Sequence, residues 1–391
     1  MFSYKFSKQD LSNYIFFFIL FDVLFLPYFQ LLLFPISLPI LFFYFILNGF
    51  KIKVNFQFQL WIFLLVLVFF SILHGTLYSY LSPFFLDNVK YFLSIVSLIL
   101  YIVFFEPISY IISIIFINKI LKVFILYVFS LTILLLFFPT EVLEFIVRVY
   151  GRNTSDLDGF LSDLRFKFFF QDPNTFAYFM TIILGFLFHS HKKNIQLFIF
   201  SFLIFFTIIM SQSAGGLFSF LLIIFIYFYR NIRYISFFRK LVLLVFFILV
   251  ISFSFFFIFY FKDKNIFIQY FFNRIFETDD RFDSGGGRFA IWTELFYLFP
   301  YPIGIGYNLY IPELLKVRSP HSDFFGLIFR YGFLSLIPIV YYLFSKFKKC
   351  YYVILPGLIT FFINTLFDDQ KLIILFFLFT IVLQNNLFRK V

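Results

Sequence analysis

The chain has 391 residues, of which 62% are hydrophobic, 27% aromatic and 13% charged, and its formal net charge is +11. Soluble domains carry about 25% charged residues, so this composition excludes a soluble globular protein. Lysine and arginine mark the cytoplasmic loops of membrane proteins, so the positive charge does not indicate a nucleic-acid partner.

Twelve apolar runs follow one another along the chain, and each approaches the roughly 20 residues that a helix needs to cross a bilayer core. They cover about 11–28, 31–49, 57–74, a run ending near 105, 123–139, 174–189, 195–210, 215–229, 241–260, 324–344, 351–366 and 371–386. We expect 108–122 to form an interfacial helix on the cytoplasmic side. The predicted fold class is therefore all-α: a polytopic integral membrane protein with about twelve transmembrane helices, in one domain, 1–391.

Two polar loops are much longer than the others, about 140–173 and 261–323. The short loops on one side of the predicted membrane carry clustered basic residues, as in RNIRYISFFRK (230–240), whereas the short turns on the other side carry Lys90 and Lys371. Basic short loops stay in the cytoplasm, while long loops cross largely regardless of charge. We therefore expect both termini inside the cell and both long loops outside it, where there is no ATP.

The second long loop contains GGGRFAIW (285–292), in which Arg288 follows three glycines and precedes a short amphipathic stretch that ends at Pro300. A guanidinium binds phosphate in a bidentate manner and stays charged at any relevant pH. Backbone N–H groups at a helix start bind anions as well, but the motif lacks the GK[ST] of a P-loop. Arg288 is therefore a candidate catalytic residue that holds a diphosphate; the alternative is a solvated arginine that contacts lipid headgroups.

The same loop ends in SPHSDF (319–324), where the first serine and the proline predict the start of the tenth span. The first turn of a helix favours the neutral form of an imidazole, so His321 is a candidate general base for a hydroxyl group. Asp323 is a candidate to orient His321, and Arg330 is a candidate to reach back toward Asp323 or a phosphate. The alternatives are an interfacial histidine, an ordinary first-turn acid and an arginine that extends to the membrane surface.

The first long loop contributes Arg165, which stands before FFQDPNTFAY (169–178). The proline cannot continue a helix from before it, so Asp172 and Asn174 are expected to cap the sixth span. Arg165 should lie on the same side of the membrane as Arg288, and two guanidinium groups can clamp a diphosphate. These three loop residues are candidate substrate-binding residues, with capping alone as the alternative for the last two. Further candidates for such a clamp, for which an ordinary surface charge is the favoured alternative, are Arg148, Arg152, Arg274 and Arg281.

Small residues in SQSAGG (211–216) would let two helices approach closely, and Gln212 within this turn is a candidate for a hydrogen bond to substrate. Gly304 and Gly306 are expected to permit a tight turn. Asp22 lies inside the first span without an identifiable partner. The outer loops show no obvious cluster of metal ligands, and the single cysteine cannot form a thiolate site; we expect neither a metal nor a cofactor.

Three stretches of the second loop, taken in order, resemble the pattern of the bacterial O-antigen polymerase and ligase superfamily. They are RFAIW (288–292), GIGY (304–307) and PHSDF (320–324), with Gly332 beyond. Members of that superfamily join glycans carried on undecaprenyl diphosphate at the outer face of the bacterial inner membrane. The resemblance implies that Arg288 and His321 correspond to the arginine and histidine of the family.

Two further segments are similar to parts of the same pattern. DPNTFAY (172–178) resembles the segment that opens a middle span in the polymerase branch, and SQSAGG resembles a turn of the family. The chain departs from the pattern at Gln212 and Ser322, where arginine and asparagine are usual. By the same resemblance, Arg165 corresponds to the loop arginine that binds diphosphate.

The resemblance implies a glycosyltransferase, namely a polymerase that joins the repeat units of O-antigen or another surface polysaccharide. Its substrate is expected to be undecaprenyl-diphosphate-linked oligosaccharide, with membrane lipids and a chain-length regulator protein as further partners and no nucleic acid. Two alternatives stay open: a ligase that transfers finished polymer to lipid A core, and a flippase or exporter of the lipid-linked oligosaccharide. Transporters carry charged or helix-breaking residues near the middle of the membrane, whereas the polar residues here gather in the outer loops.

Overall fold

The structure is a computed structural model of the chain. It describes residues 8–26, 35–52, 54–77, 85–150, 165–170, 172–190, 195–231, 260, 304, 310–311, 316–317, 322–364, 366 and 369–387. The predicted ninth span lies outside these residues apart from Tyr260, and so does most of the second long loop.

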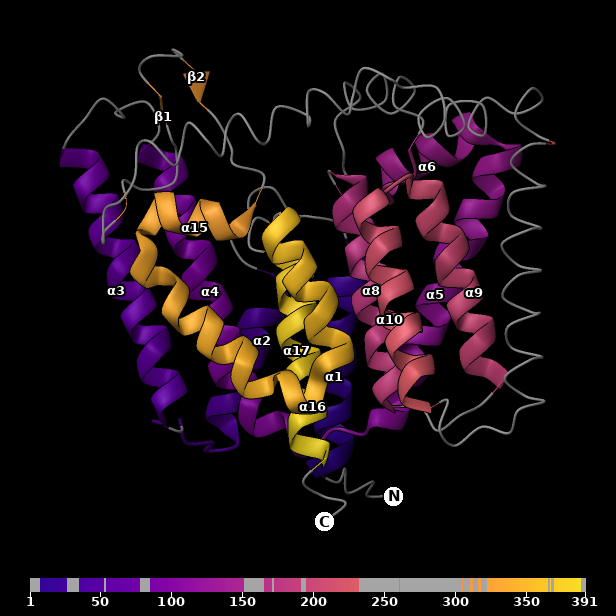
Figure 1. The fold of residues 1–391 in the computed structure, drawn as a ribbon. Helices are drawn as coiled ribbons and strands as arrows, with labels where there is room; N and C mark the ends of the chain where they lie inside the picture. Colours follow the sequence, from indigo (N-terminus) through magenta and orange to yellow (C-terminus); the bar gives the residue numbers. More distant parts are fainter. Residues whose placement is uncertain are drawn as a thin grey trace.

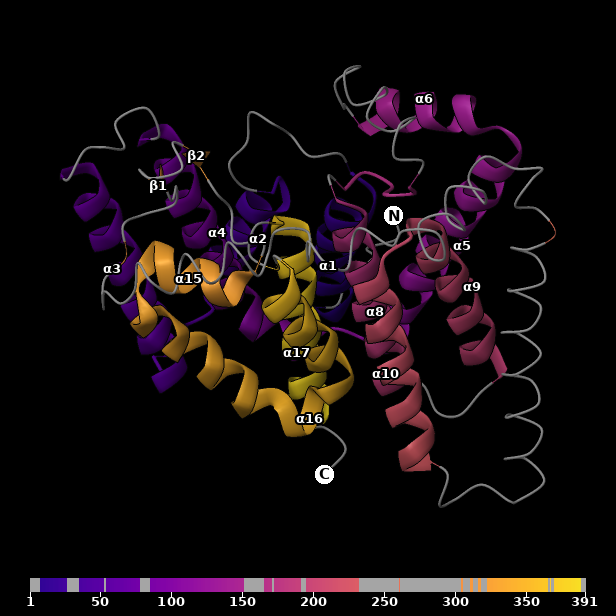
Figure 2. The same cartoon turned by 45° about the horizontal axis from the view of Figure 1, so that its top comes forward.

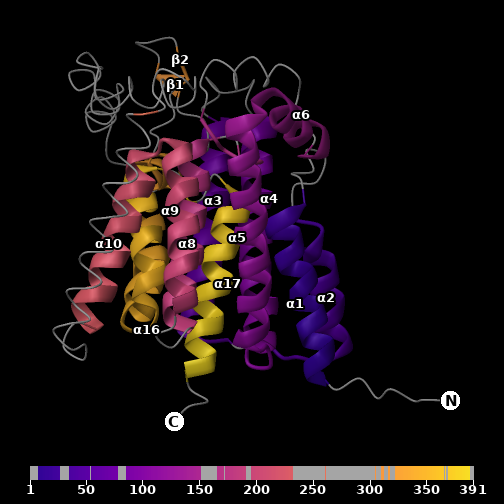
Figure 3. The ribbon, with the colours of Figure 1, turned by 90° about the vertical axis from the view of Figure 1, so that its right-hand side faces the viewer.

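The described part of the chain folds almost entirely into helices that run between the two ends of a bundle (Figure 1). They are α1 (Lys8–Phe25), α2 (Ser37–Leu47), α3 (Phe56–Leu77), α4 (Phe85–Ser109), α5 (Ile114–Phe137), α6 (Pro139–Tyr150), α8 (Pro173–Ser190), α9 (Ile195–Ser211), α10 (Ala214–Asn231), α15 (Asp323–Tyr331), α16 (Leu336–Ile363) and α17 (Gln370–Leu387). We call the end at which α1 begins and α17 finishes the lower end. At the opposite, upper end, α6 and α15 lie across the bundle, as Figure 3 also shows for α6.

Three described segments are long and apolar enough to cross a membrane: Phe56–His74 in α3, Phe92–Ser109 in α4 and Ile114–Phe137 in α5. Four shorter apolar segments lie in α2, α9, α10 and α17. Large apolar side chains such as Phe69 on α3 and Phe225 on α10 are exposed, as expected of surfaces that contact lipid. A helical membrane protein is therefore confirmed, whereas the number of about twelve spans stays a prediction.

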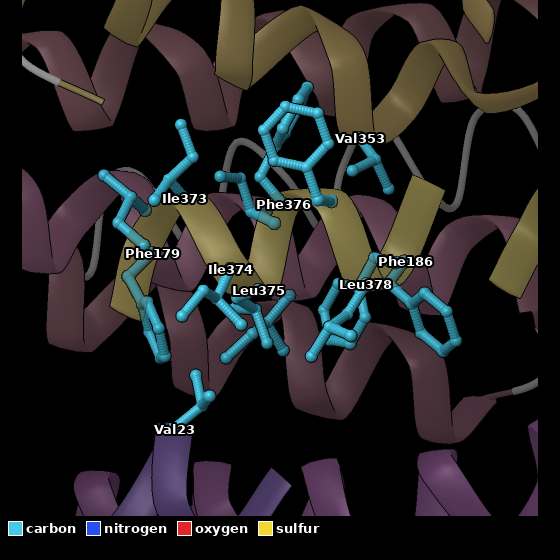
Figure 4. Close-up of a cluster of buried hydrophobic side chains, with 14 of the residues drawn as sticks. Val23, Phe179, Phe186, Val353, Ile373, Ile374, Leu375, Phe376 and Leu378 are labelled. Atoms are coloured by element: carbon cyan, nitrogen blue, oxygen red, sulfur yellow. The ribbon is translucent and has the colours of Figure 1, made fainter. Parts of the chain in front are cut away.

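The core of the bundle is built around α17, which packs against α1, α4, α8 and α16. Every residue of α17 from Lys371 to Leu383 is buried. Figure 4 shows Ile374, Leu375 and Leu378 among side chains from α1 and α8. A helix that is apolar on all sides must be enclosed by others, and the last apolar run of the sequence forms such a helix.

Close backbone contact joins α8 to α16. A Cβ atom at Gly185 would lie 2.1 Å from the carbonyl oxygen of Tyr352, so only glycine fits at this position of α8. Near the same place, Nε2 of His189 accepts the backbone N–H of Tyr352 (3.1 Å). This bond satisfies one of the donors that a helix start leaves without an intrahelical partner.

The region around 108–122 differs from the prediction of an interfacial helix. α4 continues to Ser109, and α5 begins at Ile114 and runs without a break to Phe137. Lys122 does not end the apolar run, because its Nζ donates to Oε1 of Gln196 (2.9 Å) on α9. One lysine with a neighbouring acceptor is thus accommodated within a long helix.

An amphipathic helix does lie across the bundle, but within the first long loop. α6 begins at Pro139, which suits the first position of a helix, and it buries the spaced apolar residues Val142, Leu143, Ile146, Val147 and Tyr150. Figure 2 shows α6 lying across the upper end of the bundle near α5. The predicted first long loop therefore contains a helix that was not predicted.

The predicted tenth span, 324–344, is not one helix. α15 ends at Tyr331, Gly332 adopts a φ of +84°, and a short 3-10 turn, Phe333–Ser335, leads into α16. Glycine takes this backbone conformation without the steric cost that a Cβ atom brings. α15 therefore lies across the upper end instead of continuing into α16 (Figure 1).

α16 itself consists of two arms, 336–349 and 351–363, which meet at a kink at Cys350 (φ −127°, ψ 26°) near the lower end. This agrees with the predicted turn between the last two spans before α17. The all-α prediction needs one small correction, because Tyr310–Ile311 (β1) and Lys316–Val317 (β2) form an antiparallel pair of two-residue strands in the second long loop.

Candidate functional site

Arg165 begins the described segment 165–170, and its guanidinium lies against the turn between α9 and α10. Its Nε donates to the carbonyl of Ser211 (3.1 Å), while its Nη2 donates to the carbonyl of Gln212 and to Oδ1 of Asn174 (both 3.3 Å). Arg165 is half-buried. Acceptors from α8, from α9 and from the turn therefore hold one planar cation in a fixed orientation at the upper end.

Asp172 and Asn174 form the cap at the start of α8, as predicted. Oδ1 of Asp172 accepts both the backbone N–H and the side-chain N–H of Asn174 (3.0 Å each). Pro173 occupies the first helical position, where the missing N–H would have no intrahelical partner. Because Asn174 also accepts from Arg165, this side chain connects the helix cap to the guanidinium.

Asn364, at the end of α16, connects the same cap to α15. Its Nδ2 donates to Oδ2 of Asp172 (3.3 Å), and its carbonyl accepts the backbone N–H of Asp323 (3.1 Å). Oδ2 of Asp323 in turn accepts the N–H of Leu366. Asn364 and Asp323 are only 4% and 2% exposed, so these bonds are shielded from water. Below, we call Arg165, Asp172, Asn174, Asp323 and Asn364 the polar cluster.

Ser322 directly follows His321 in the sequence and is fully buried. Its Oγ donates to the carbonyl of Phe362 (2.8 Å), two residues before Asn364. α15 begins after it, at Asp323, so the helix starts later than the serine and proline of SPHSDF predicted. His321 and Arg288 both lie outside the described residues, and their contacts stay predictions.

Two residues beside Arg165 have unusual backbone conformations. Phe168 and Gln212 have φ angles of +50° and +52°, in a region that costs a non-glycine residue on the order of 1–3 kcal/mol. Phe168 is fully buried, and its ring contacts those of Tyr150 and Phe169 at centroid distances of 5.0 and 4.4 Å. Aromatic packing therefore offsets the strain and gives the segment after Arg165 one shape.

Gln212 contributes its backbone instead of its side chain to the described contacts with Arg165. The turn in which it lies confirms the expected close approach of helices: a Cβ atom at Gly216 would lie 2.3 Å from Cβ of Ala177 on α8, and one at Gly215 would lie 2.1 Å from Oη of Tyr178. SQSAGG therefore brings two carbonyls to the guanidinium because its glycines let α10 pack against α8.

Asp22, for which the sequence alone offered no partner, belongs to a second group of polar residues near the end of α1. Lys371 is 5% exposed; its Nζ donates to the backbone carbonyls of Asp22 (2.8 Å) and Leu26, and it lies 4.5 Å from the ring centroid of Phe169. The carboxylate of Asp22 accepts the N–H (2.8 Å) and Oγ–H (2.5 Å) of Ser37. Lys371 therefore joins the end of α1 to α17 and to the segment that carries Arg165.

Arg330 is buried in the last turn of α15, with 6% exposure, which excludes the alternative of a side chain that extends to the surface. Gly304 lies against its backbone, since a Cβ atom there would be 2.2 Å from the carbonyl carbon of Arg330. The carbonyl of Gly304 is also 3.2 Å from Nδ1 of His74 on α3. Gly304 is thus required by close packing, and not by a left-handed turn; Gly306 lies outside the described residues.

Arg148 has the surface role that was expected for it. It is paired with Glu144 one turn away (3.1 Å), and the two side chains are 79% and 47% exposed. Arg152, Arg274 and Arg281 lie outside the described residues. Within the described ranges, no group of three or more histidine, cysteine, aspartate or glutamate side chains is placed to hold a metal ion.

Residues 199–340 match the family model described as O-antigen ligase. The match confirms the resemblance to the O-antigen polymerase and ligase superfamily. It covers most of α9, all of α10 and α15 and the first residues of α16, together with Gln212, Arg288, His321, Asp323 and Arg330. No curated protein and no solved structure showed a significant match. The superfamily match supports a membrane enzyme that transfers glycosyl groups.

Two residues of this region were missed by sequence reasoning, Asn364 and Lys371. Asn364 ends an apolar run and belongs to no local motif. Lys371 was assigned to a short turn outside the membrane, where a basic residue is usually an ordinary loop charge. A lysine in the first turn of an otherwise apolar helix indicates a buried cation, and this signal could have identified Lys371. No comparable signal marks Asn364.

Proposed function

We propose that this chain is a polysaccharide polymerase that joins oligosaccharide repeat units carried on undecaprenyl diphosphate. A hydroxyl group at the non-reducing end of one lipid-linked unit attacks the anomeric carbon of another. The new glycosidic C–O bond forms, the C–O bond to the diphosphate breaks, and undecaprenyl diphosphate leaves with the electron pair. His321 accepts the proton of the attacking hydroxyl.

The observation that carries this proposal is the position of Arg165 in the polar cluster. A guanidinium held by acceptors from several elements is preorganised to meet the charge that develops on a leaving diphosphate. The same cluster ends at Asp323, two residues after His321 in the sequence. In this proposal Arg288 supplies the second guanidinium of the clamp, and the polar cluster fixes the start of α15.

The distribution of charge supports an orientation in which the upper end faces the periplasm and both termini are cytoplasmic, in the bacterial inner membrane. The residues that follow α2, begin α5 and surround the kink of α16 belong to the lower end, and they include Lys51, Lys119 and Lys348. Lysines of this kind mark cytoplasmic loops. The diphosphate then meets the polar cluster from the outer leaflet.

The proposal is tested in a bacterium that lacks its native copy of this gene. Complementation with Arg165→Ala, Arg288→Ala or His321→Ala should leave only single-repeat glycan, whereas the unaltered chain should restore long polysaccharide. Arg148→Ala is the matched control, because that exposed arginine is paired with Glu144 and should not affect chain length. Normal polymer from both Arg288→Ala and His321→Ala would refute the assigned chemistry.

The description of the matching family model, O-antigen ligase, favours a second candidate. A ligase would use the same diphosphate clamp and the same base, with lipid A core as the acceptor. The two activities differ in what accumulates when the gene is deleted: a polymerase mutant carries single repeats on its lipopolysaccharide, whereas a ligase mutant accumulates finished polymer on the lipid carrier.

A further inference from the structure

His74 lies in the last turn of α3, the helix that reaches the upper end beside α15 (Figure 1). It is the final residue of the apolar segment Phe56–His74, and its side chain is half-buried. Its Nδ1 lies 3.2 Å from the carbonyl oxygen of Gly304, 230 positions later in the chain. Because a carbonyl oxygen can only accept, Nδ1 carries the proton and donates it. One backbone atom of the second long loop therefore fixes the orientation of this imidazole.

Gly304 in turn lies against the end of α15. A Cβ atom at Gly304 would lie 2.2 Å from the carbonyl carbon of Arg330 and 2.3 Å from the backbone nitrogen of Tyr331. The backbone of Gly304 thus packs directly on the peptide bond between those two residues, while its carbonyl accepts from His74 on α3. Gly304 therefore connects α3 to the last turn of α15.

The two ends of α15 are held by different contacts. At its start, the backbone N–H of Asp323 donates to the carbonyl of Asn364 (3.1 Å). At its end, Oγ of Ser335 donates to the carbonyl of Leu327 (3.1 Å), but Ser335 lies only eight residues further on, in the turn that directly follows α15. That bond is local to the segment, whereas the contact through Gly304 fixes the end of α15 relative to another helix.

We propose that His74 is a positioning residue for α15. By donating to Gly304, its imidazole holds the loop backbone against the Arg330–Tyr331 peptide and so sets where α15 crosses the upper end. This inference deepens the proposed function and rests on it for its consequence in catalysis: His321 stands two residues before α15, so a displaced helix moves the base relative to the diphosphate. The role requires a donor bonded to Cγ of residue 74.

Asparagine and glutamine separate this donor from the other properties of the imidazole. In His74→Asn the amide nitrogen is bonded to Cγ, as Nδ1 is, so the bond to Gly304 can be kept. In His74→Gln the same amide lies one carbon further along the side chain, at the position of Nε2 instead. The two substitutions introduce the same polar group, but only His74→Asn should preserve the position of α15.

The first measurement follows α15 without an assay of activity. Spin labels are attached to the full chain in nanodiscs through Phe225→Cys on α10 and Phe333→Cys in the turn after α15, in a Cys350→Ser background; both phenylalanines are exposed (65% and 44%). Pulsed electron paramagnetic resonance then gives the distribution of distances between the labels. The distribution should be unchanged by His74→Asn and should broaden or shift with His74→Gln. If His74→Gln disturbs it no more than His74→Asn does, the proposal is overturned.

The second measurement is glycan length in complemented cells. Loss of one hydrogen bond should lower the rate at which repeats are joined by about two- to tenfold in His74→Gln, while His74→Asn restores long polysaccharide. Phe70→Leu, at an exposed position (48%) one turn earlier on α3, is the control and should leave glycan length unchanged.

The two proposals fail in different ways. If Arg288→Ala and His321→Ala leave the polymer normal, the proposed function is wrong, and the label distances alone decide whether His74 positions α15. If those two substitutions abolish the polymer and His74→Gln leaves its length unchanged, His74 does not position the site.

Discussion

The side-chain amide of Asn364 donates to the carboxylate of Asp172 across 3.3 Å, although the two residues lie 192 positions apart in the chain. Asp172 caps α8 and Asn364 ends α16, and the backbone of Asn364 also holds Asp323 at the start of α15. Asn364 therefore connects the predicted diphosphate-binding segment, through its side chain, to the helix that follows His321, through its backbone.

Asn364→Ala should impair the protein without removing any group that we assign to substrate. The substitution removes the donor to Asp172, and a hydrogen-bonded group left without its partner costs about 1–3 kcal/mol when it is buried. We expect a lower thermal stability of the purified protein and shortened polysaccharide in complemented cells. Asn385→Ala is a control of equal burial, since Asn385 bonds to Ser109 near the lower end; it should lower stability while leaving the glycan length distribution unchanged.

Arg165→Lys tests whether the shape of the guanidinium matters as well as its charge. Lysine keeps the positive charge but cannot match the planar set of N–H donors that meets Ser211, Gln212 and Asn174. We expect about tenfold weaker binding of undecaprenyl diphosphate in nanodiscs, measured by isothermal titration. Arg148→Lys should bind as tightly as the unaltered chain; equal affinity of Arg165→Lys would show that this arginine does not contact the diphosphate.

Lys371→Met should destabilise the upper end through α1. Its loss leaves the carbonyls of Asp22 and Leu26 without their shared donor, at about 1–3 kcal/mol for each group that stays buried and unpaired. Asp22→Asn keeps the backbone carbonyl that accepts from Lys371 and removes the negative charge of the side chain, which acts on the Lys371 ammonium. A double-mutant cycle with this substitution, followed by thermal unfolding in detergent, therefore measures the electrostatic part of the link and should give a coupling energy of roughly 0.5–3 kcal/mol. Additive effects would contradict an energetic link between the two residues, and Lys348→Met, at an exposed lysine, should have no effect.

Gly304→Ala should displace α15. The added Cβ atom would lie 2.2 Å from the carbonyl carbon of Arg330, and backbone atoms cannot move aside as the end of a flexible side chain can. We therefore expect the free energy of unfolding to fall by about 1–3 kcal/mol and the amount of polymer to be reduced. Gly49→Ala is the comparison at the lower end: a Cβ atom there meets nothing within 4 Å, and only the φ of +58° opposes it. Unchanged glycan from Gly304→Ala would argue against a role for this contact.

Much of the helical arrangement could be predicted from hydrophobic runs and their boundaries. The predicted spans 174–189, 195–210 and 215–229 correspond to α8, α9 and α10 within one or two residues, because proline, glycine and polar residues bound these runs sharply. Hydropathy failed where local conformation decided the outcome. The break at Gly332 lies within an apolar run, where its φ of +84° and the short turn Phe333–Ser335 separate α15 from α16.

Some residues of the candidate site could be predicted from the local sequence, and others could not. Arg165, Asp172 and Asn174 are close in sequence to a proline that fixes where α8 begins, so their proximity could be predicted. The partners Asn364 and Lys371 come from the far end of the chain, and no periodicity relates them to residues 172 or 22. Such long-range pairs depend on how α16 and α17 pack against α8 and α1, which local pattern does not encode.

The contact of Gly185 with Tyr352 has a bearing on how substrate is received. α8 is buried at every position from Thr175 to Phe188, and its backbone contacts that of α16. The two helices that position Asp172, Asn174 and Asn364 therefore have little freedom to rearrange. A ligand that meets groups already held in place loses less entropy on binding. In the proposed reaction, the motions that admit and release a long lipid-borne glycan would then belong to other parts of the chain.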